Sequence, residues 1–147
     1  MDDVFVQIVT KEKPEKKNVN KKMKHEAKYQ TLFNMWLKDN HFPTGAFELK
    51  QTQGNAIPFS SVKAHQLRAL RIAKYSTLVH KISDLDVGFK PFDSFCLTKT
   101  PAYVVLFFRR RGYFIDVDVW ADEQSKSTRK SIIEQRAKEL STTILQL

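Results

Sequence analysis

The feature that most constrains the fold is a run of seven apolar residues, Ala102–Phe108, which no charged side chain interrupts. Seven residues make a strand, whereas a membrane-spanning helix needs about 20 apolar residues. A strand that is apolar at every position is buried on both faces, and such strands lie in the middle of sheets covered by helices. The run therefore predicts an α/β domain with a central β-sheet flanked by helices.

The chain has 147 residues, which fits a single domain. We expect residues 1–20 to form an N-terminal strand and basic linker, residues 21–120 the core, and residues 121–147 a C-terminal helix. Hydrophobic periodicity predicts strands and helices that alternate as in a mixed sheet. The predicted elements are a strand at 4–10, a helix at 20–38, a strand at 46–50, a helix from 60 or 61 to 75, strands at 91–97, 102–108 and 113–120, and a helix from about 127.

The chain is strongly basic. It has 25 Lys and Arg against 16 Asp and Glu, which gives a net charge of +9 and a pI near 9.7. A basic surface of this size indicates a polyanionic partner, usually nucleic acid. Residues 11–28 hold eight lysines and three glutamates, and this segment is interpreted either as a solvated linker or as a phosphate-contacting one.

Several classes of protein are disfavoured. Cys96 is the only cysteine, so the chain has no disulfide and no Cys-rich zinc site of its own. The sequence contains no glycine-rich phosphate loop and no nucleophile elbow. The first residues lack a basic and apolar leader, so we expect a soluble cytoplasmic protein of a bacterial or archaeal cell, encoded either by the cell or by a phage.

The sharpest local motif is Glu48-Leu49-Lys50 in the predicted strand at 46–50. Because side chains alternate along a strand, Glu48 and Lys50 share one face while Phe47 and Leu49 fill the other. A carboxylate can bind Mg²⁺, and a neighbouring lysine can orient water near a phosphodiester. The alternative interpretation is an ordinary charge pair on a solvent-facing strand.

Two further polar residues lie on apolar helix stripes. Gln66 follows Val62 by four residues, and Glu26 precedes Tyr29 by three. A buried amide needs hydrogen-bond partners, so each residue is either a structural polar group or part of one buried polar site with Glu48.

The segments Phe47–Thr52, Ile57–Phe59 and His65-Gln66 together resemble the core of RecU-type Holliday junction resolvases. Those enzymes belong to the PD-(D/E)XK nuclease superfamily, as do the archaeal Hjc resolvases. The resemblance covers about residues 22–120, and its specific part is residues 47–66. It implies a restriction-endonuclease-like fold, Mg²⁺-dependent cleavage with Mn²⁺ as a substitute, four-way DNA junctions as substrate, and a symmetric homodimer.

The resemblance also implies roles for individual residues. Glu48 matches a metal ligand, with the backbone carbonyl of Leu49 as a further ligand, and Lys50 matches the catalytic lysine. Gln66 matches the helix glutamine that supports the site, and Glu26 the acidic residue of the first helix.

The chain departs from the family at one ligand. The family has an aspartate on a strand just before the acidic-x-Lys strand, whereas here residues 40–45 lead directly from helix to strand. Asp93 is the first candidate for a replacement, on a strand expected to lie beside Glu48. Asp39 is the second candidate, and Asp84 or Asp86 the third. Asp116 and Asp118 are interpreted as a solvated strand edge.

A set of basic residues is expected to contact the DNA backbone. These residues are Lys63, His65, Arg68, Arg71, Lys74, Arg109, Arg110 and Arg111. The first strand or the last helix is expected to form the dimer interface. Two other functions remain open: a non-catalytic basic nucleic-acid-binding protein on the same fold, and a repair or restriction-like nuclease of the same superfamily.

Overall fold

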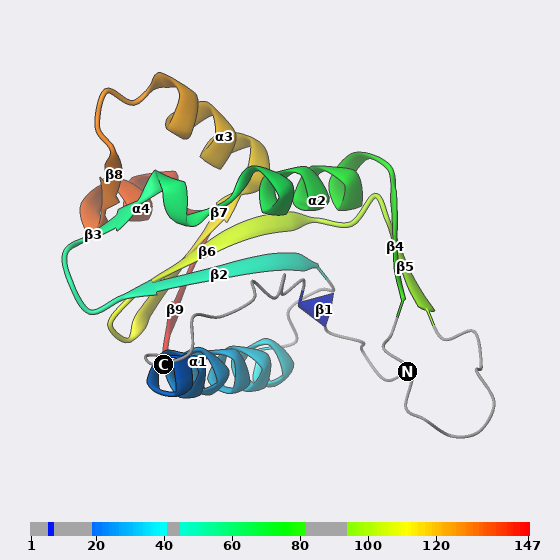
Figure 1. The fold of residues 1–147 in the computed structure, drawn as a ribbon, viewed down its shortest axis with the longest axis horizontal. Helices are drawn as coiled ribbons and strands as arrows, with labels where there is room; N and C mark the ends of the chain where they lie inside the picture. Colours follow the sequence, from blue (N-terminus) through cyan, green and yellow to red (C-terminus); the bar gives the residue numbers. More distant parts are fainter. Residues whose placement is uncertain (1–5, 8–18, 41–44, 82–93) are drawn as a thin grey trace.

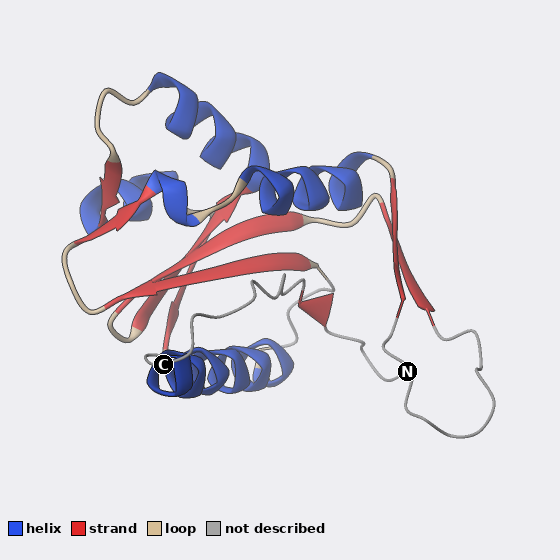
Figure 2. Cartoon of the chain, in the orientation of Figure 1, coloured by secondary structure: helices blue, strands red, loops and turns tan. Residues whose placement is uncertain are grey.

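The computed structural model describes residues 6–7, 19–40, 45–81 and 94–147, which form an α/β arrangement (Figures 1 and 2). The strands are β1 (Val6–Gln7), β2 (Ala46–Thr52), β3 (Ala56–Pro58), β4 (Thr77–Lys81), β5 (Ser94–Thr98), β6 (Ala102–Phe108), β7 (Arg111–Asp116), β8 (Ser131–Ile133) and β9 (Thr143–Gln146). The helices are α1 (Val19–Asp39), the 3₁₀ turn η1 (Phe59–Ser61), α2 (Ala64–Tyr75), α3 (Val117–Lys126) and α4 (Glu134–Leu140). No helix in these described segments is both long enough and apolar enough to cross a membrane.

The strands β2, β6, β7 and β9 form the central mixed sheet, in that order, and the two-residue β1 extends it beyond β2. β2 and β6 are parallel neighbours, with Glu48 opposite Val104, while β7 is antiparallel to both β6 and β9. Parallel neighbours need a crossover connection, and α2 lies within the one between β2 and β6. The prediction that Ala102–Phe108 is a central strand is confirmed, since β6 lies between β2 and β7 and residues 104–107 are fully buried.

Helices cover both faces of this sheet, as Figure 1 shows. Alternate residues of each strand enter two separate cores. Phe47, Val105 and Phe107 pack against α1, whereas Val104 and Leu106 pack in the other core with α2 and α3. The α1 core is aromatic: the Phe33 ring lies 5.2 Å from that of Phe47 and 6.0 Å from that of Phe107, both edge to face.

The predicted strand at 113–120 is wrong in its second half. β7 ends at Asp116, whose side chain accepts a hydrogen bond from the backbone N–H of Asp118 at 2.9 Å and so caps α3. Val117 and Trp120 are fully buried and three residues apart, which is helical spacing. Helix capping therefore turns the chain where apolar content alone suggested a continued strand.

The predicted C-terminal helix from residue 127 is confirmed only over α4 and is wrong on either side of it. The segment instead forms β8, α4 and β9, and β9 pairs with β7. The predicted apolar stripe contained Ile133, Ala137, Leu140, Ile144 and Leu147, yet Ile144 is 48% exposed while its neighbour Leu145 is buried. Strand geometry explains this reversal, because adjacent residues face opposite sides and pairing satisfies the open edge of β7.

Sequence periodicity did not predict the two small two-stranded sheets. β3 pairs with β8, and β4 pairs with β5 in a ribbon that extends away from the central sheet (Figure 1). The predicted helix from residue 60 or 61 is η1 followed by α2, and β2 continues to Thr52, two residues beyond the predicted strand at 46–50.

Candidate functional site

The centre of the candidate site is the carboxylate of Glu48, which is buried with only 6% of the residue exposed. Its Oε1 atom lies 2.9 Å from the Nζ atom of Lys50 and accepts a hydrogen bond from Nε2 of Gln66 at 2.8 Å. β2 supplies the two charged residues on the face opposite Phe47, as alternation predicts, and α2 supplies the amide. Three residues predicted to form one polar site therefore do lie together.

The orientation of the Gln66 amide is fixed by the start of α2. Its Oε1 atom accepts a hydrogen bond from the backbone N–H of Lys63 at 2.9 Å, which satisfies one of the unpaired donors of a helix N-terminus. Because the oxygen is engaged there, the NH₂ group is the part that reaches Glu48. The hydrogen bond from Lys63 and the hydrogen bond to Glu48 together fix one rotamer of the Gln66 side chain.

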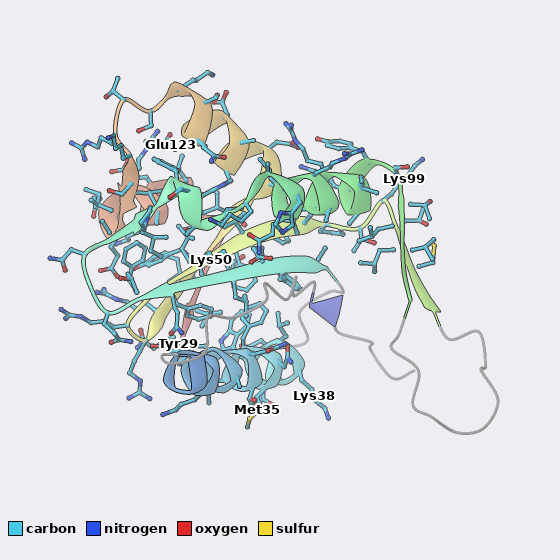
Figure 3. The ribbon with its side chains drawn as sticks, in the orientation of Figure 1. Tyr29, Met35, Lys38, Lys50, Lys99 and Glu123 are labelled. Carbon is cyan, nitrogen blue, oxygen red and sulfur yellow. The ribbon has the colours of Figure 1, made fainter. Side chains whose placement is uncertain are left out.

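The site opens to solvent on the lysine side. The side chain of Lys50 is 19% exposed, against 8% for that of Glu48. β1 pairs with β2 only at Ala46 and Phe47, so beyond Phe47 no described strand adjoins this edge of β2. Lys50, labelled in Figure 3, is thus the more exposed of the two charged side chains. A buried carboxylate is costly without partners, and the Lys50 and Gln66 donors offset that cost.

The structure does not describe the side chains of most of the other acidic candidates. Glu26 and Asp39 belong to α1, which covers the opposite face of the sheet, and Asp39 is exposed at its end. Asp84, Asp86 and Asp93 lie outside the described residues.

The expectation that the strand at 91–97 lies beside β2 is wrong for its described residues, 94–97. That strand is β5, which begins at Ser94 and pairs with β4. The sheet neighbours of β2 are β1 and β6. Across the described ranges, no group of three or more His, Cys, Asp or Glu side chains is placed to hold a metal ion.

Two of the basic residues on α2 already have acidic partners. Lys74 Nζ lies 2.8 Å from Oδ1 of Asp116 and 2.7 Å from Oδ2 of Asp118, and Arg71 Nε lies 3.3 Å from Oδ1 of Asp118. Tyr75 donates its hydroxyl hydrogen to Asp118. The interpretation of Asp116 and Asp118 as a solvated strand edge is therefore wrong. The sequence contained a signal for a helix start that we missed. Asp116, a residue type that caps helices, directly precedes the helically spaced pair Val117 and Trp120.

The contacts of this cluster shift the pKa values of Asp118 and Lys74. Burial favours the neutral form of Asp118, but hydrogen bonds from Lys74 and Tyr75 outweigh it, so the pKa of Asp118 lies below its usual value. Burial likewise opposes the charge on Lys74, but hydrogen bonds to Asp116 and Asp118 raise the pKa of Lys74 well above normal. Asp118 and Lys74 thus remain ionised at neutral pH, and their ion pair joins α2 to the start of α3.

The remaining expected DNA-contacting residues differ in their surroundings. Arg111 Nε lies 3.0 Å from Glu134, while Lys63 and Arg68 are exposed on α2 and have no ion pair among the described residues. A shallow hollow of about 450 Å³ follows the outer side of α2, away from Glu48, and Arg68 is one of its lining residues. His65 is exposed beside Gln66 in the first turn of α2. Arg109 and Arg110 are exposed in the turn between β6 and β7.

No family model matches the chain, and no curated protein or solved structure matches it either. The geometry of Glu48, Lys50 and Gln66 and the motif at residues 47–66 are therefore the basis for a function.

Proposed function

We propose that this protein is a metal-dependent DNA endonuclease with a restriction-endonuclease-like fold, and that it cleaves four-way junctions as RecU-type resolvases do. The observation that carries the proposal is the buried Glu48 carboxylate held between Lys50 and Gln66. These three residues are the ones that the motif links to catalysis, although Gln66 is 18 residues away from Glu48.

Each residue has a task in phosphodiester hydrolysis. A water oxygen forms a bond to phosphorus while an ester P–O bond breaks. Lys50 orients that water and offsets the charge that develops on the phosphate oxygens. Gln66 holds the Glu48 carboxylate in one direction. Mg²⁺, when bound, supplies further charge stabilisation to the phosphate.

The Glu48 carboxylate and the Leu49 carbonyl supply oxygen atoms, which are the ligand atoms that Mg²⁺ prefers. These two groups do not complete an octahedral set, so water, phosphate oxygens or another carboxylate must supply the rest. Asp93 is our first candidate for that carboxylate, with Asp84 next, because Asp39 lies on α1 at the opposite face of the sheet.

The charge of the chain supports DNA as the substrate. The net charge of +9 favours a polyanion, and α2 presents Lys63 and Arg68 close to Gln66 in sequence. A four-way junction presents paired cleavage points, so the proposed active form is a homodimer with twofold symmetry.

One observation favours a second candidate, a non-catalytic nucleic-acid-binding protein. Glu48 and Lys50 are 2.9 Å apart and so neutralise each other as an ion pair. In that case the pair is structural and the basic surface alone carries the function.

The test is an assay of the purified chain with Mg²⁺ or Mn²⁺ on four-way junctions, flaps and linear duplex. Glu48→Gln and Lys50→Met should each abolish cleavage while circular dichroism shows an intact fold. Lys126→Met is the matched control, because Lys126 is 74% exposed and pairs with Asp122 on α3.

Each result separates the candidates. Full cleavage by Glu48→Gln rejects the nuclease proposal. Binding to all three DNAs without cleavage by the wild-type chain supports the non-catalytic protein, and cleavage confined to duplex supports a repair or restriction-like nuclease. Asp93→Asn should remove metal-dependent cleavage but retain junction binding. If Asp93→Asn retains cleavage, Asp84→Asn is the next variant to test.

A further inference from the structure

The connection between β6 and β7 is a two-residue turn in which both residues are arginine. β6 ends at Phe108 and β7 begins at Arg111, which leaves Arg109 and Arg110 as the turn. Arg109 has φ = 57°, in the left-handed region. Two-residue hairpin turns favour Asn, Asp or Gly because those residues adopt this region with less strain. The chain therefore places a strained arginine where glycine would be more favourable.

The backbone of this turn is held by three other parts of the fold. The N–H of Arg109 donates to the carbonyl oxygen of Thr52 at 3.0 Å, and the Tyr29 hydroxyl donates to the Arg109 carbonyl at 2.8 Å. The N–H of Leu147 donates to the Arg110 carbonyl at 2.8 Å. β2, α1 and the residue after β9 thus fix the directions in which both arginine side chains leave the backbone.

The two arginines are also uncompensated. Both are exposed, and neither has an ion pair with any described residue. The next residue differs, because Arg111 pairs with Glu134 at 3.0 Å. Two positive charges therefore project from a turn whose backbone is held by hydrogen bonds at this end of the sheet.

The turn follows β6 and lies beside the end of β2, the strand that carries the candidate site. Thr52 is paired with Phe108, and it follows Glu48 by four residues on β2. At about 3.3 Å per residue, the turn is about 13 Å along the sheet from Glu48. This distance corresponds to about four base-pair steps of duplex DNA at about 3.4 Å each.

We propose that Arg109 and Arg110 form a preorganised phosphate-binding site that holds the DNA backbone about four base-pair steps from the bond cleaved at Glu48. This inference rests on the proposed function, because its ligand is the backbone of the DNA that the site would cleave. A binding side chain whose backbone is already held in place loses less conformational entropy on binding than one on a mobile backbone. The strain at Arg109 and its hydrogen bonds are explained by this preorganisation.

The chain contains a matched control. Lys99 is the other described non-glycine residue with positive φ, at 48°, and it is also exposed and has no ion pair with a described residue. It precedes β6, whereas Arg109 follows it, so the two lie at opposite ends of that strand. Figure 3 labels Lys99 at one end of the molecule and Tyr29, which contacts the Arg109 turn, at the other. Replacing either residue by glycine removes one charge and relieves similar strain.

The experiment measures binding of the full chain to a labelled four-way junction over a range of salt concentrations. Arg109→Gly should weaken binding several-fold and lower the slope of log K against log salt by about 1, because one phosphate contact is lost. Its melting temperature should equal or exceed that of the wild type, since glycine relieves the strain. Arg109→Asn, which also tolerates positive φ, should weaken binding in the same way. Lys99→Gly should leave both affinity and slope unchanged.

Wild-type affinity and slope in Arg109→Gly would overturn the inference, as would an equal loss of binding in Lys99→Gly. Because cleavage is not the readout, this failure is distinct from failure of the proposed function, which Glu48→Gln tests. A wild-type chain that binds no DNA overturns both.

Discussion

The side-chain amide of Gln66 donates a hydrogen bond to the Glu48 carboxylate over 2.8 Å and so joins the first turn of α2 to β2. Both residues are buried, with 7% of Gln66 and 6% of Glu48 exposed. A buried carboxylate that loses a donor is not rescued by bulk water, so this contact affects stability as well as the proposed catalysis.

The first prediction concerns this hydrogen bond. Gln66→Leu should lower the free energy of unfolding by about 1–3 kcal/mol, because the buried Glu48 carboxylate then loses the Gln66 hydrogen bond and retains the Lys50 contact. Glu48→Leu should destabilise by a similar mechanism, and the double variant should lose less than the two single losses added together. Urea denaturation measures all three, with the exposed Gln135→Leu as control. Additive losses would show that the two residues are not coupled.

The second prediction compares two arginines on α2. Arg68 has no ion pair among the described residues, whereas Arg71 already lies 3.3 Å from Asp118. Arg68→Ala should therefore lower the salt slope of junction binding by about 1, and Arg71→Ala by less. Fluorescence anisotropy across a salt series measures the difference. A larger effect for Arg71 would indicate that its ion pair opens when DNA binds.

The third prediction is a pH dependence. The pKa of Asp118 is lowered in the folded chain, so its contribution to stability is present above the ordinary value of 3.8. That contribution is lost as pH falls through the lower, folded pKa. Asp118→Asn should thus lower stability at neutral pH and flatten the loss of stability in acid. Urea denaturation between about pH 6 and pH 2 tests this. Parallel curves for the two proteins would contradict it.

The fourth prediction uses two glycines. A Cβ atom at Gly112 would lie 2.7 Å from Cε1 of Phe107 and 2.8 Å from Cγ of Leu145, both inside the α1 core. Gly112→Ala should therefore destabilise the chain by about 1–3 kcal/mol through overpacking. At Gly54 the nearest atom, Oγ1 of Thr52, would be 3.4 Å away, so Gly54→Ala should be far milder. Thermal unfolding compares the two, and equal losses would count against the packing described for β7.

The sequence by itself determined those features that depend on local pattern. The uninterrupted apolar run at Ala102–Phe108 predicted a central strand, and alternation around Phe47 placed Glu48 and Lys50 on a common face. The helical stripe of α2 predicted that Gln66 is buried. In each case a period of two or 3.6 residues decides the direction of a side chain, and that period is readable along the chain.

Tertiary structure alone decided the features that depend on a partner far away in sequence. Residues 143–146 form a strand because β7 offers an open edge, although their apolar spacing also fits a helix. Lys74 is neutralised by Asp116 across 42 residues, and Tyr29 reaches the Arg109 carbonyl across 80. A local pattern specifies which way a side chain points, but it does not specify what it will meet. Pairing a strand edge or forming an ion pair stabilises the protein only when two segments that are distant in sequence lie side by side. Only the fold brings such segments together.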